Sequence, residues 1–189
     1  MKPEASLQPQ APYPGGSRRN VALIGFMGVG KTTVGAILAQ VLGFEFLDTD
    51  KVIEQRQGRR IADIFAAEGE PFFRQLESSL CAELESATGK VIATGGGLPV
   101  NPENLASLRR HALVVCLWAS PEVIHARVRT QQHRPLLHAE DPLARIRELL
   151  ALRTPAYKGA HLILGVDYRS PAETARHIAN AFRHGHAAA

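Results

Sequence analysis

The segment GFMGVGKTT (25–33) has the residue types and spacing of a loop that holds phosphate groups. It fits the pattern Gly-x-x-x-x-Gly-Lys-Thr, with an apolar run before it and a helical pattern after it. Glycines let backbone N–H groups turn inward around phosphates, and the following helix directs its positive N-terminal end at the same place. We expect Lys31 to reach the terminal phosphates and Thr32 to offer its hydroxyl to Mg²⁺. The loop predicts nucleotide binding, but kinases, GTPases, ATPases and nucleotide sensors all use one.

Two carboxylates follow the apolar run FEFLD (44–48): Asp48 ends the run, and Asp50 comes two residues later. In a doubly wound sheet, ligands gather at the carboxyl ends of the strands, so both carboxylates would lie beside the phosphate loop. We expect one of them to help hold Mg²⁺ and the other to contact the hydroxyl that attacks. The alternative is that either one only caps the helix that starts near residue 50.

Two further features suit a small acceptor molecule. Gly95-Gly96-Gly97 directly follows the apolar run VIAT (91–94). Three glycines leave backbone open to close approach by a ligand, although they also suit a simple tight turn. Arg74 and Arg153 would bind a carboxylate on the acceptor if they converge, although a lone arginine is more often a surface charge.

The polar segment TQQHRPLLHAED (130–141) separates two helical patterns. A connection of this length in a compact domain is usually functional or disordered. We expect a lid that closes over the nucleotide and excludes water, with Arg134 facing the phosphoryl group that is transferred. The alternative is a mobile surface loop.

These residues need a framework, and the sequence predicts one in which short apolar runs alternate with helical patterns. The expected strands are 20–24, 44–48, 91–94, 112–118 and 161–165, and the expected helices are 31–42, 71–86, 102–110, 121–129, 142–152 and 171–182. Four of the last five helices begin at a proline that follows Ser, Asn or Asp, which are natural N-caps. Strands that are apolar throughout are typical of a parallel sheet covered on both faces. We therefore predict a three-layer α/β fold, with a five-stranded parallel sheet flanked by helices.

Length and composition indicate one domain over residues 20–184 of the 189, with a short tail at 185–189. Residues 1–19 contain no apolar run, so we expect a disordered extension rather than a signal peptide, and a cytoplasmic location. No stretch is long and apolar enough for a membrane span, and Cys81 and Cys116 are expected to be reduced and packed. The net charge of +4 comes mostly from scattered arginines, which suits small anionic ligands better than nucleic acid.

Taken together, these motifs resemble the shikimate kinases. The resemblance covers about residues 20–182 and rests on the segments GFMGVGKTT, FLDTD, FFRQLE, ATGGG, RPLL and LRTPAY, in that order and spacing. It implies a P-loop kinase fold related to the nucleoside monophosphate kinases. It also implies Mg²⁺-dependent transfer of the γ-phosphoryl group of ATP to the 3-hydroxyl of shikimate, a step toward chorismate and the aromatic amino acids. We expect a monomer whose partners are small molecules.

The resemblance also implies a role for individual residues. ATP would be bound by Gly28, Val29, Gly30, Lys31, Thr32, Thr33 and Arg134, with Arg127 and the segment Arg169-Ser170-Pro171 flanking the adenine. Mg²⁺ would be held by Thr32, with Asp48 acting through water. Shikimate would be bound by Asp50 at its hydroxyls, by Arg74 and Arg153 at its carboxylate, and by the backbone of Gly96 and Gly97. Lys31, Asp50 and Arg134 would be catalytic, and Glu77 would orient Arg74.

Three alternatives differ in what they predict. A related kinase for another small acid, such as gluconate, would share the phosphate loop but not the acceptor residues. A GTPase-like switch would commonly carry Asn-Lys-x-Asp, which does not occur in this sequence, and would hydrolyse nucleotide without an acceptor. A nucleic-acid binder would show strong, salt-sensitive binding to DNA or RNA.

Overall fold

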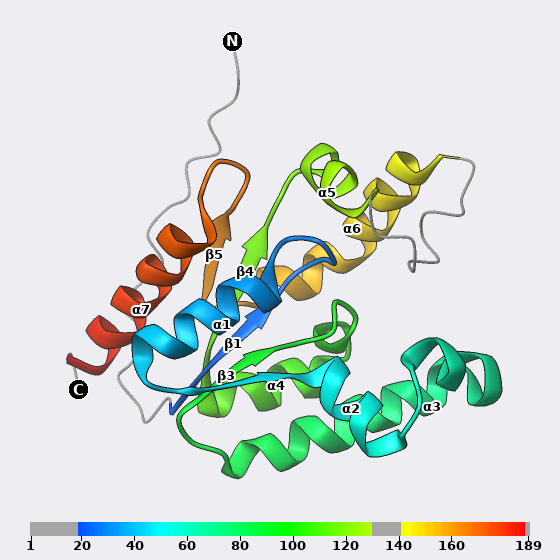
Figure 1. Ribbon diagram of the computed structural model, residues 1–189, viewed down its shortest axis with the longest axis horizontal. Coiled ribbons are helices and arrows are strands. Elements are labelled where there is room, and N and C mark those ends of the chain that lie inside the picture. Colours follow the sequence, from blue (N-terminus) through cyan, green and yellow to red (C-terminus); the bar gives the residue numbers. More distant parts are fainter. Residues whose placement is uncertain (1–18, 130–140, 188–189) are drawn as a thin grey trace.

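A computed structural model describes residues 19–129 and 141–187 of the chain (Figure 1). These residues form the strands β1 (Asn20–Ile24), β2 (Glu45–Asp48), β3 (Lys90–Ala93), β4 (Ala112–Trp118) and β5 (Leu162–Gly165). The α-helices are α1 (Lys31–Leu42), α2 (Thr49–Gln57), α3 (Ile61–Glu83), α4 (Pro102–His111), α5 (Pro121–Val128), α6 (Pro142–Lys158) and α7 (Pro171–Ala187). Two 3₁₀ turns, η1 (Leu84–Ser86) and η2 (Leu98–Val100), follow α3 and β3.

The five strands form one parallel sheet in the order β2-β3-β1-β4-β5, as the alternation of apolar runs predicted. β1 lies at the centre, where Val21 pairs with Val91 of β3 on one side and with Leu113 of β4 on the other. Because β1 is buried along its whole length, it needs the continuous apolar sequence that it has. All five strands run in the same direction, so the loops after β1, β2 and β3 meet at one edge of the sheet.

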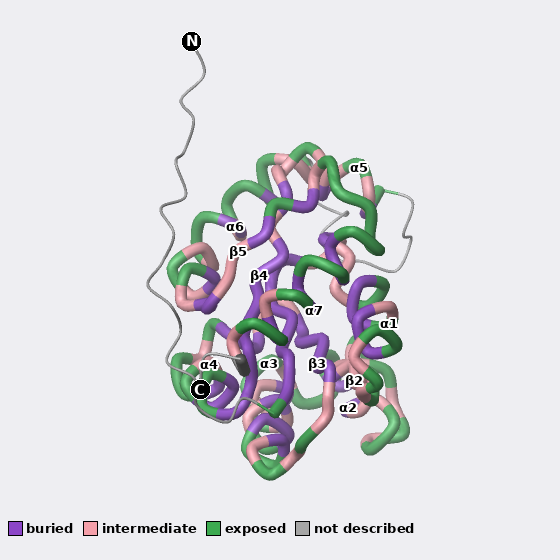
Figure 2. The backbone as a smooth tube through the Cα atoms, turned by 90° about the vertical axis from the view of Figure 1, so that its left-hand side faces the viewer, coloured by how far each residue is buried: buried purple, intermediate pink, exposed green. Residues whose placement is uncertain are grey.

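Helices cover both faces of the sheet and complete the three predicted layers. α1 and α7 pack against each other over one face, whereas α3 and α4 lie over the other, with the buried strands between them (Figure 2). α1 lies very close to the sheet at Gly35, where a Cβ atom would be 2.5 Å from the ring of Phe46. The helix that carries the phosphate loop is therefore held tightly against the core.

The predicted N-caps are confirmed at all four helices that begin with proline. The side chains of Asn101, Ser120, Asp141 and Ser170 accept hydrogen bonds from backbone N–H groups in the first turns of α4, α5, α6 and α7. These bonds satisfy donors that have no partner within the helix, while proline at the first position needs none. Local sequence therefore fixes where four helices begin.

Three helices are longer than predicted. α3 starts at Ile61 rather than Pro71, and Gly69 (φ 81°, ψ 175°) kinks it, so that it consists of two helical segments. Gly69 and Pro71 are ordinary helix breakers, which is why the sequence indicated only the second segment. α6 continues past Leu152 and Pro155 to Lys158, and α7 continues past Phe182 to Ala187. In α6 the buried Tyr157 anchors the last turn despite the proline.

Cys81 and Cys116 are free and buried, as expected. Removal from water raises the pKa of both thiols, and that of Cys116 to about 12, so neither is a thiolate at neutral pH. Of the helices in the described part of the chain, none combines the length and the apolar character needed to cross a membrane.

Candidate active site

The loop between β1 and α1 is shaped by three glycines whose backbone angles other residues rarely adopt. Gly25, Gly28 and Gly30 have φ angles of 132°, 77° and 100°. A Cβ atom on Gly25 would also lie 2.4 Å from the Leu117 carbonyl oxygen. Lys31 reaches back across the loop, and its Nζ donates to the carbonyls of Gly25 and Phe26, both at 2.8 Å. The loop thus presents backbone N–H groups, a helix N-terminus and an ammonium group at one place, which suits a polyphosphate.

Asp48 at the end of β2 has two separate tasks. Its Oδ1 accepts from the backbone N–H groups of Asp50 and Lys51 at 3.2 and 3.4 Å, and so caps α2. Its Oδ2 accepts from Thr32 Oγ1 at 3.0 Å and so joins β2 to the phosphate loop. The capping alternative and the proposed position beside the phosphate loop therefore hold for the same carboxylate.

Gly95 allows two buried carboxylates to approach the end of β3. A Cβ atom at this residue would lie 2.5 Å from Asp50 Oδ1 and 2.9 Å from Glu77 Oε1. Within residues 19–129 and 141–187, these two oxygens are buried and accept no hydrogen bond. A buried acceptor without a partner is costly, and of these two residues only Asp50 also lines the cavity beside the phosphate loop.

Burial raises the pKa values of Asp50 and Glu77, and nearby positive charges act to lower them. Burial, with a contribution from the nearby Asp48, raises the pKa of Asp50 to about 6, although the positive charge of Lys31 acts to lower it. Burial also raises the pKa of Glu77, against the opposing effect of its ion pair with Arg74. At neutral pH, Asp50 is therefore a carboxylate that is more basic than an ordinary aspartate.

Two arginines from different helices reach the same glycine turn. Arg74 of α3 donates from Nη1 to Glu77 at 2.6 Å, and from Nε and Nη2 to Glu70 at 3.0 and 2.6 Å. Its Nη1 would be 2.6 Å from a Cβ atom on Gly97. Arg153 lies inside α6, not at a helix end as predicted, and its Nη1 would be 3.4 Å from a Cβ atom on Gly96.

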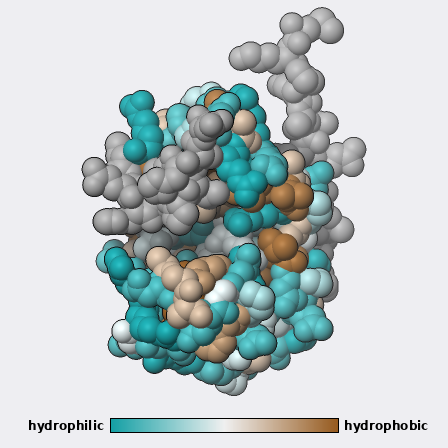
Figure 3. Space-filling view, turned by 90° about the vertical axis from the view of Figure 1, so that its right-hand side faces the viewer, coloured by the Kyte–Doolittle hydropathy of each residue, from teal (hydrophilic) through white to brown (hydrophobic). Residues whose placement is uncertain are grey.

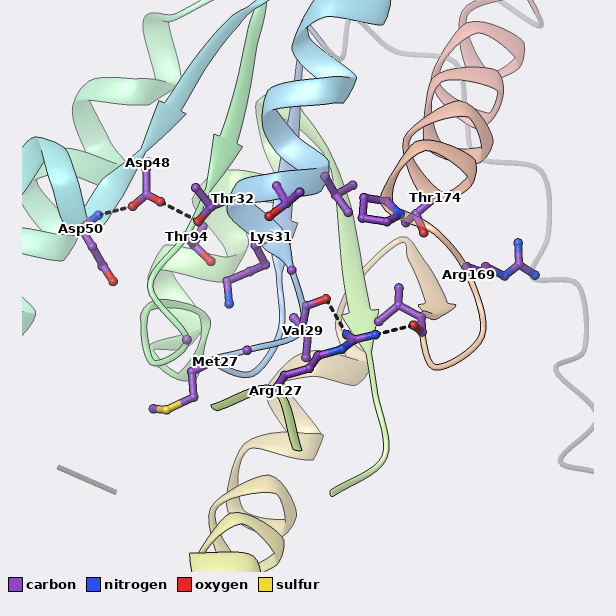
Figure 4. A pocket seen from close by; sticks show the side chains of 17 residues that line it. Met27, Val29, Lys31, Thr32, Asp48, Asp50, Thr94, Arg127, Arg169 and Thr174 are labelled. Carbon is purple, nitrogen blue, oxygen red and sulfur yellow. Dashed lines mark hydrogen bonds between the residues drawn. The ribbon is translucent and has the colours of Figure 1, made fainter. Parts of the chain in front are cut away.

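The phosphate loop and this turn border one cavity of about 480 Å³ (Figure 4). Figure 4 shows Asp48 and Asp50 at one end, Arg169 and Thr174 at the other, and Lys31 between them. The cavity is lined by Met27, Gly28, Val29, Gly30, Lys31, Thr32, Thr33, Val34, Asp48, Asp50, Thr94, Gly96, Arg127, Val166, Arg169, Pro171 and Thr174. Apart from Ser170, every predicted nucleotide residue in the described part of the chain is in this set.

The remaining predicted residues fall into two groups. Arg74, Gly97 and Arg153 do not line the cavity itself but lie at the glycine turn, which reaches the cavity through Gly96. Arg134 and most of the predicted lid lie outside the described residues.

Sequence reasoning missed several residues that the structure brings to the site. Val166 and Thr174 line the nucleotide end, where the Val166 carbonyl accepts from Arg127 Nη2 at 3.0 Å. Tyr157 lies behind the glycine turn, and its hydroxyl donates to the Gly96 carbonyl at 2.8 Å. Lining residues of this kind have the pattern of ordinary core residues. For Tyr157, the available signals were its place four residues after Arg153 and at the end of the segment LRTPAY.

Comparisons with known proteins show which family the chain is similar to. The family model described as shikimate kinase matches residues 27–183, which is most of the chain. A shikimate kinase of Caldanaerobacter subterraneus is 43% identical over 164 residues, covering 87% of this chain and 96% of the relative. A shikimate kinase of Symbiobacterium thermophilum is 47% identical over 154 residues, covering 80% of this chain and 88% of the relative.

Solved structures give the same grouping. A shikimate kinase from Acinetobacter baumannii, in complex with shikimate, superposes with a TM-score of 0.83 and 38% identity. The match covers 88% of this chain and 93% of that one. A gluconokinase from Sinorhizobium meliloti has a TM-score of 0.57 at 16% identity, over 89% of this chain and 94% of that one. This second likeness extends to the fold alone.

The raised pKa of Asp50 predicts a pH-dependent contribution to stability. The folded protein holds this proton more tightly than the unfolded chain, where the pKa is near 3.8. The resulting stabilisation is complete below about pH 4 and is lost as the pH rises through about 6. Asp50→Asn removes this titration. The free energy of unfolding of the variant minus that of wild type should therefore be about 2 kcal/mol larger at about pH 7.5 than at about pH 4. Urea unfolding of both proteins in EDTA measures this, and an unchanged difference between the two pH values would contradict it.

Proposed function

The chain belongs to the shikimate kinase family, and we propose that its cavity is where the γ-phosphoryl group of ATP passes to the 3-hydroxyl of shikimate. The products are ADP and shikimate 3-phosphate, and the reaction is a step in chorismate and aromatic amino acid biosynthesis. One observation carries the assignment of the site. A phosphate loop and a turn approached by two arginines and two carboxylates border a single cavity at the same edge of the sheet.

The nucleotide occupies the cavity from the phosphate loop to the loop before α7. Gly28 to Thr33 bind the phosphates through backbone N–H groups, and Lys31 leaves its two carbonyl partners to pair with the terminal phosphates. The adenine lies at the far end, beside Arg127, Arg169 and Pro171. This placement is supported by the shared lining of one cavity and by the bond that holds Arg127 to Val166.

The site also suits Mg²⁺. Thr32 would be a direct ligand and Asp48 would bind through water, a proposal supported by the 3.0 Å contact between Thr32 Oγ1 and Asp48 Oδ2. Among the described residues there is no cluster of three or more His, Cys, Asp or Glu that would form a metal cage. Mg²⁺ commonly uses one or two protein oxygens with water and phosphate oxygens, so one hydroxyl and one carboxylate are sufficient. When bound, the ion neutralises charge on the β- and γ-phosphates.

Shikimate is held by its carboxylate and oriented by its hydroxyls. Arg74 and Arg153 bind the carboxylate. Arg74 Nε and Nη2 donate to Glu70 in the free protein, so they must leave Glu70 to bind the ligand. Asp50, which lines the cavity, accepts a hydrogen bond from the attacking hydroxyl. An alcohol is a very weak acid, so the first task of Asp50 is to orient the hydroxyl in line with the γ-phosphorus atom.

Catalysis in this proposal consists mainly of positioning and charge stabilisation. Lys31 offsets charge on the transferring phosphoryl group from the phosphate loop. Arg134 would do so from the opposite side, a role supported by the resemblance of the segment RPLL to the lid of this family.

A monomer in the cytoplasm remains part of the proposal. In the part of the chain that the structure describes, the exposed large hydrophobic residues lie on four elements and one loop: Val41 on α1, Phe65 on α3, Val100 on η2, Leu152 on α6, and Tyr168 between β5 and α7. Figure 3 shows hydrophilic colours over much of one face of the molecule, with separate tan and brown hydrophobic groups around a central hollow. The two buried free thiols are in keeping with a reducing compartment.

The function is tested by ADP release from ATP and Mg²⁺ with no acceptor, with shikimate and with gluconate. We expect rapid release with shikimate only, because the two arginines and Asp50 fit a ring that carries a carboxylate and hydroxyls. Stimulation by gluconate alone would overturn the acceptor assignment but leave the nucleotide site. A slow rate that no acceptor changes would favour the switch alternative. EDTA should abolish the stimulated rate, and added Mg²⁺ should restore it.

Arg153→Ala should weaken the binding of shikimate and leave ATP binding intact. Losing a charge-assisted contact to the carboxylate raises the KM for shikimate about 10- to 100-fold. Steady-state kinetics with each substrate varied in turn measure the effect. Arg147→Ala is the matched control, because Arg147 lies on the same helix and pairs with Glu122 on the surface. Equal effects of the two substitutions on the KM for shikimate would remove Arg153 from the site.

A further inference from the structure

Tyr157 is a buried residue that reaches the acceptor turn from behind. It lies in the last turn of α6 with 1% of its surface exposed, and its hydroxyl donates to the Gly96 carbonyl at 2.8 Å. Burial raises the pKa of this hydroxyl to about 12, so it stays protonated and remains a donor at neutral pH. A tyrosine buried this deeply needs a partner for its hydroxyl, and the glycine turn provides it.

The three glycine carbonyls are held in two different ways. The Gly95 carbonyl accepts from the Leu98 N–H at 3.2 Å, and the Gly97 carbonyl accepts from the Val100 N–H at 3.0 Å. Both bonds belong to the backbone of the turn that leads into η2. Over the described residues, the Gly96 carbonyl receives no backbone N–H, and Tyr157 is its donor. The middle peptide of the turn is therefore fixed by a side chain from another element.

Fixing the Gly96 carbonyl also fixes the N–H group of Gly97. The two groups belong to one peptide plane, and in a trans peptide they point in opposite directions. No acceptor within the part of the chain that the structure describes takes a hydrogen bond from the N–H of Gly96 or Gly97, and both residues are partly exposed. These N–H groups are thus available to a ligand, and the direction of the Gly97 N–H depends on Tyr157.

The same helix face carries a residue of the proposed site. Arg153 and Tyr157 are four residues apart on α6, so their side chains lie on the same face. Arg153 approaches Gly96 from the side where another residue would carry its Cβ atom, and such an atom would be 3.4 Å from Arg153 Nη1. α6 therefore sets the position of the turn and of the arginine together.

We propose that Tyr157 is a positioning residue for the acceptor: by holding the Gly96 carbonyl, it aims the Gly97 N–H at a hydroxyl of shikimate. This inference rests on the proposed function and adds to it a residue that does not touch the substrate. Without the hydroxyl, glycine gives the 96–97 peptide freedom to rotate. The turn would then lose the fixed donor that a rigid site requires.

Tyr157→Phe tests the proposal, because phenylalanine keeps the buried ring and removes only the hydroxyl. We expect kcat/KM for shikimate to fall about tenfold, with a change of less than about twofold in the KM for ATP. Thr154→Val is the control: it removes one hydroxyl from the same helix, whose bond runs to the Leu150 carbonyl within α6. Its kinetics should match wild type. Urea unfolding and nucleotide binding are measured on both variants to establish that each is folded.

The outcomes separate this inference from the proposed function. Without shikimate-stimulated ADP release in wild type, the proposed function itself fails. If wild type is active and Tyr157→Phe has the same kcat/KM for shikimate, only the role of Tyr157 is overturned. A parallel loss for both substrates, together with lower stability, would make Tyr157 a structural residue and would also overturn the inference.

Discussion

The close approach of charged side chains to Gly95-Gly96-Gly97 is the constraint on which the rest of the site depends. Asp50 and Glu77 lie where a Cβ atom of Gly95 would be, and Arg74 lies where that of Gly97 would be. A methyl group at either position would push these side-chain ends away by roughly half an ångström, because Cβ contacts under 3.0 Å are essentially never found. The glycine turn thus sets the spacing between the carboxylates and guanidinium groups that α2, α3 and α6 contribute.

The positive charges near the glycine turn also offset part of the cost of burying Glu77 and Asp50. The Glu77 side chain is almost fully buried, and its ion pair with Arg74 offsets part of the desolvation that raises its pKa. Asp50 has no such direct partner in the described part of the chain, and only the nearby Lys31 and Arg74 oppose the rise in its pKa. The site therefore pairs one carboxylate with an arginine and leaves the other, which is more basic than an ordinary aspartate, for the ligand.

Much of this could be predicted from sequence because local chemistry decided it. Buried parallel strands require continuous apolar runs, proline after Asn, Ser or Asp marks a helix start, and the phosphate loop has a distinctive spacing of glycine and lysine. Longer-range effects could not be predicted. The first segment of α3 was missed because Gly69 and Pro71 suggest a break, and α6 was ended too early because packing of Tyr157 outweighs Pro155. That Arg74 and Arg153 meet at one turn is likewise a property of packing, which spacing along the chain does not contain.

The central claim is that Asp50, which lines the cavity, directs the acceptor hydroxyl toward the phosphoryl group held by the phosphate loop. The most direct measurement compares turnover and ATP affinity in wild type and Asp50→Asn at saturating ATP, Mg²⁺ and shikimate. Asparagine keeps the shape but lacks the charge and one acceptor oxygen, so kcat should fall by about 100-fold or more while ATP affinity changes little. Near wild-type kcat in a correctly folded Asp50→Asn protein would contradict the account.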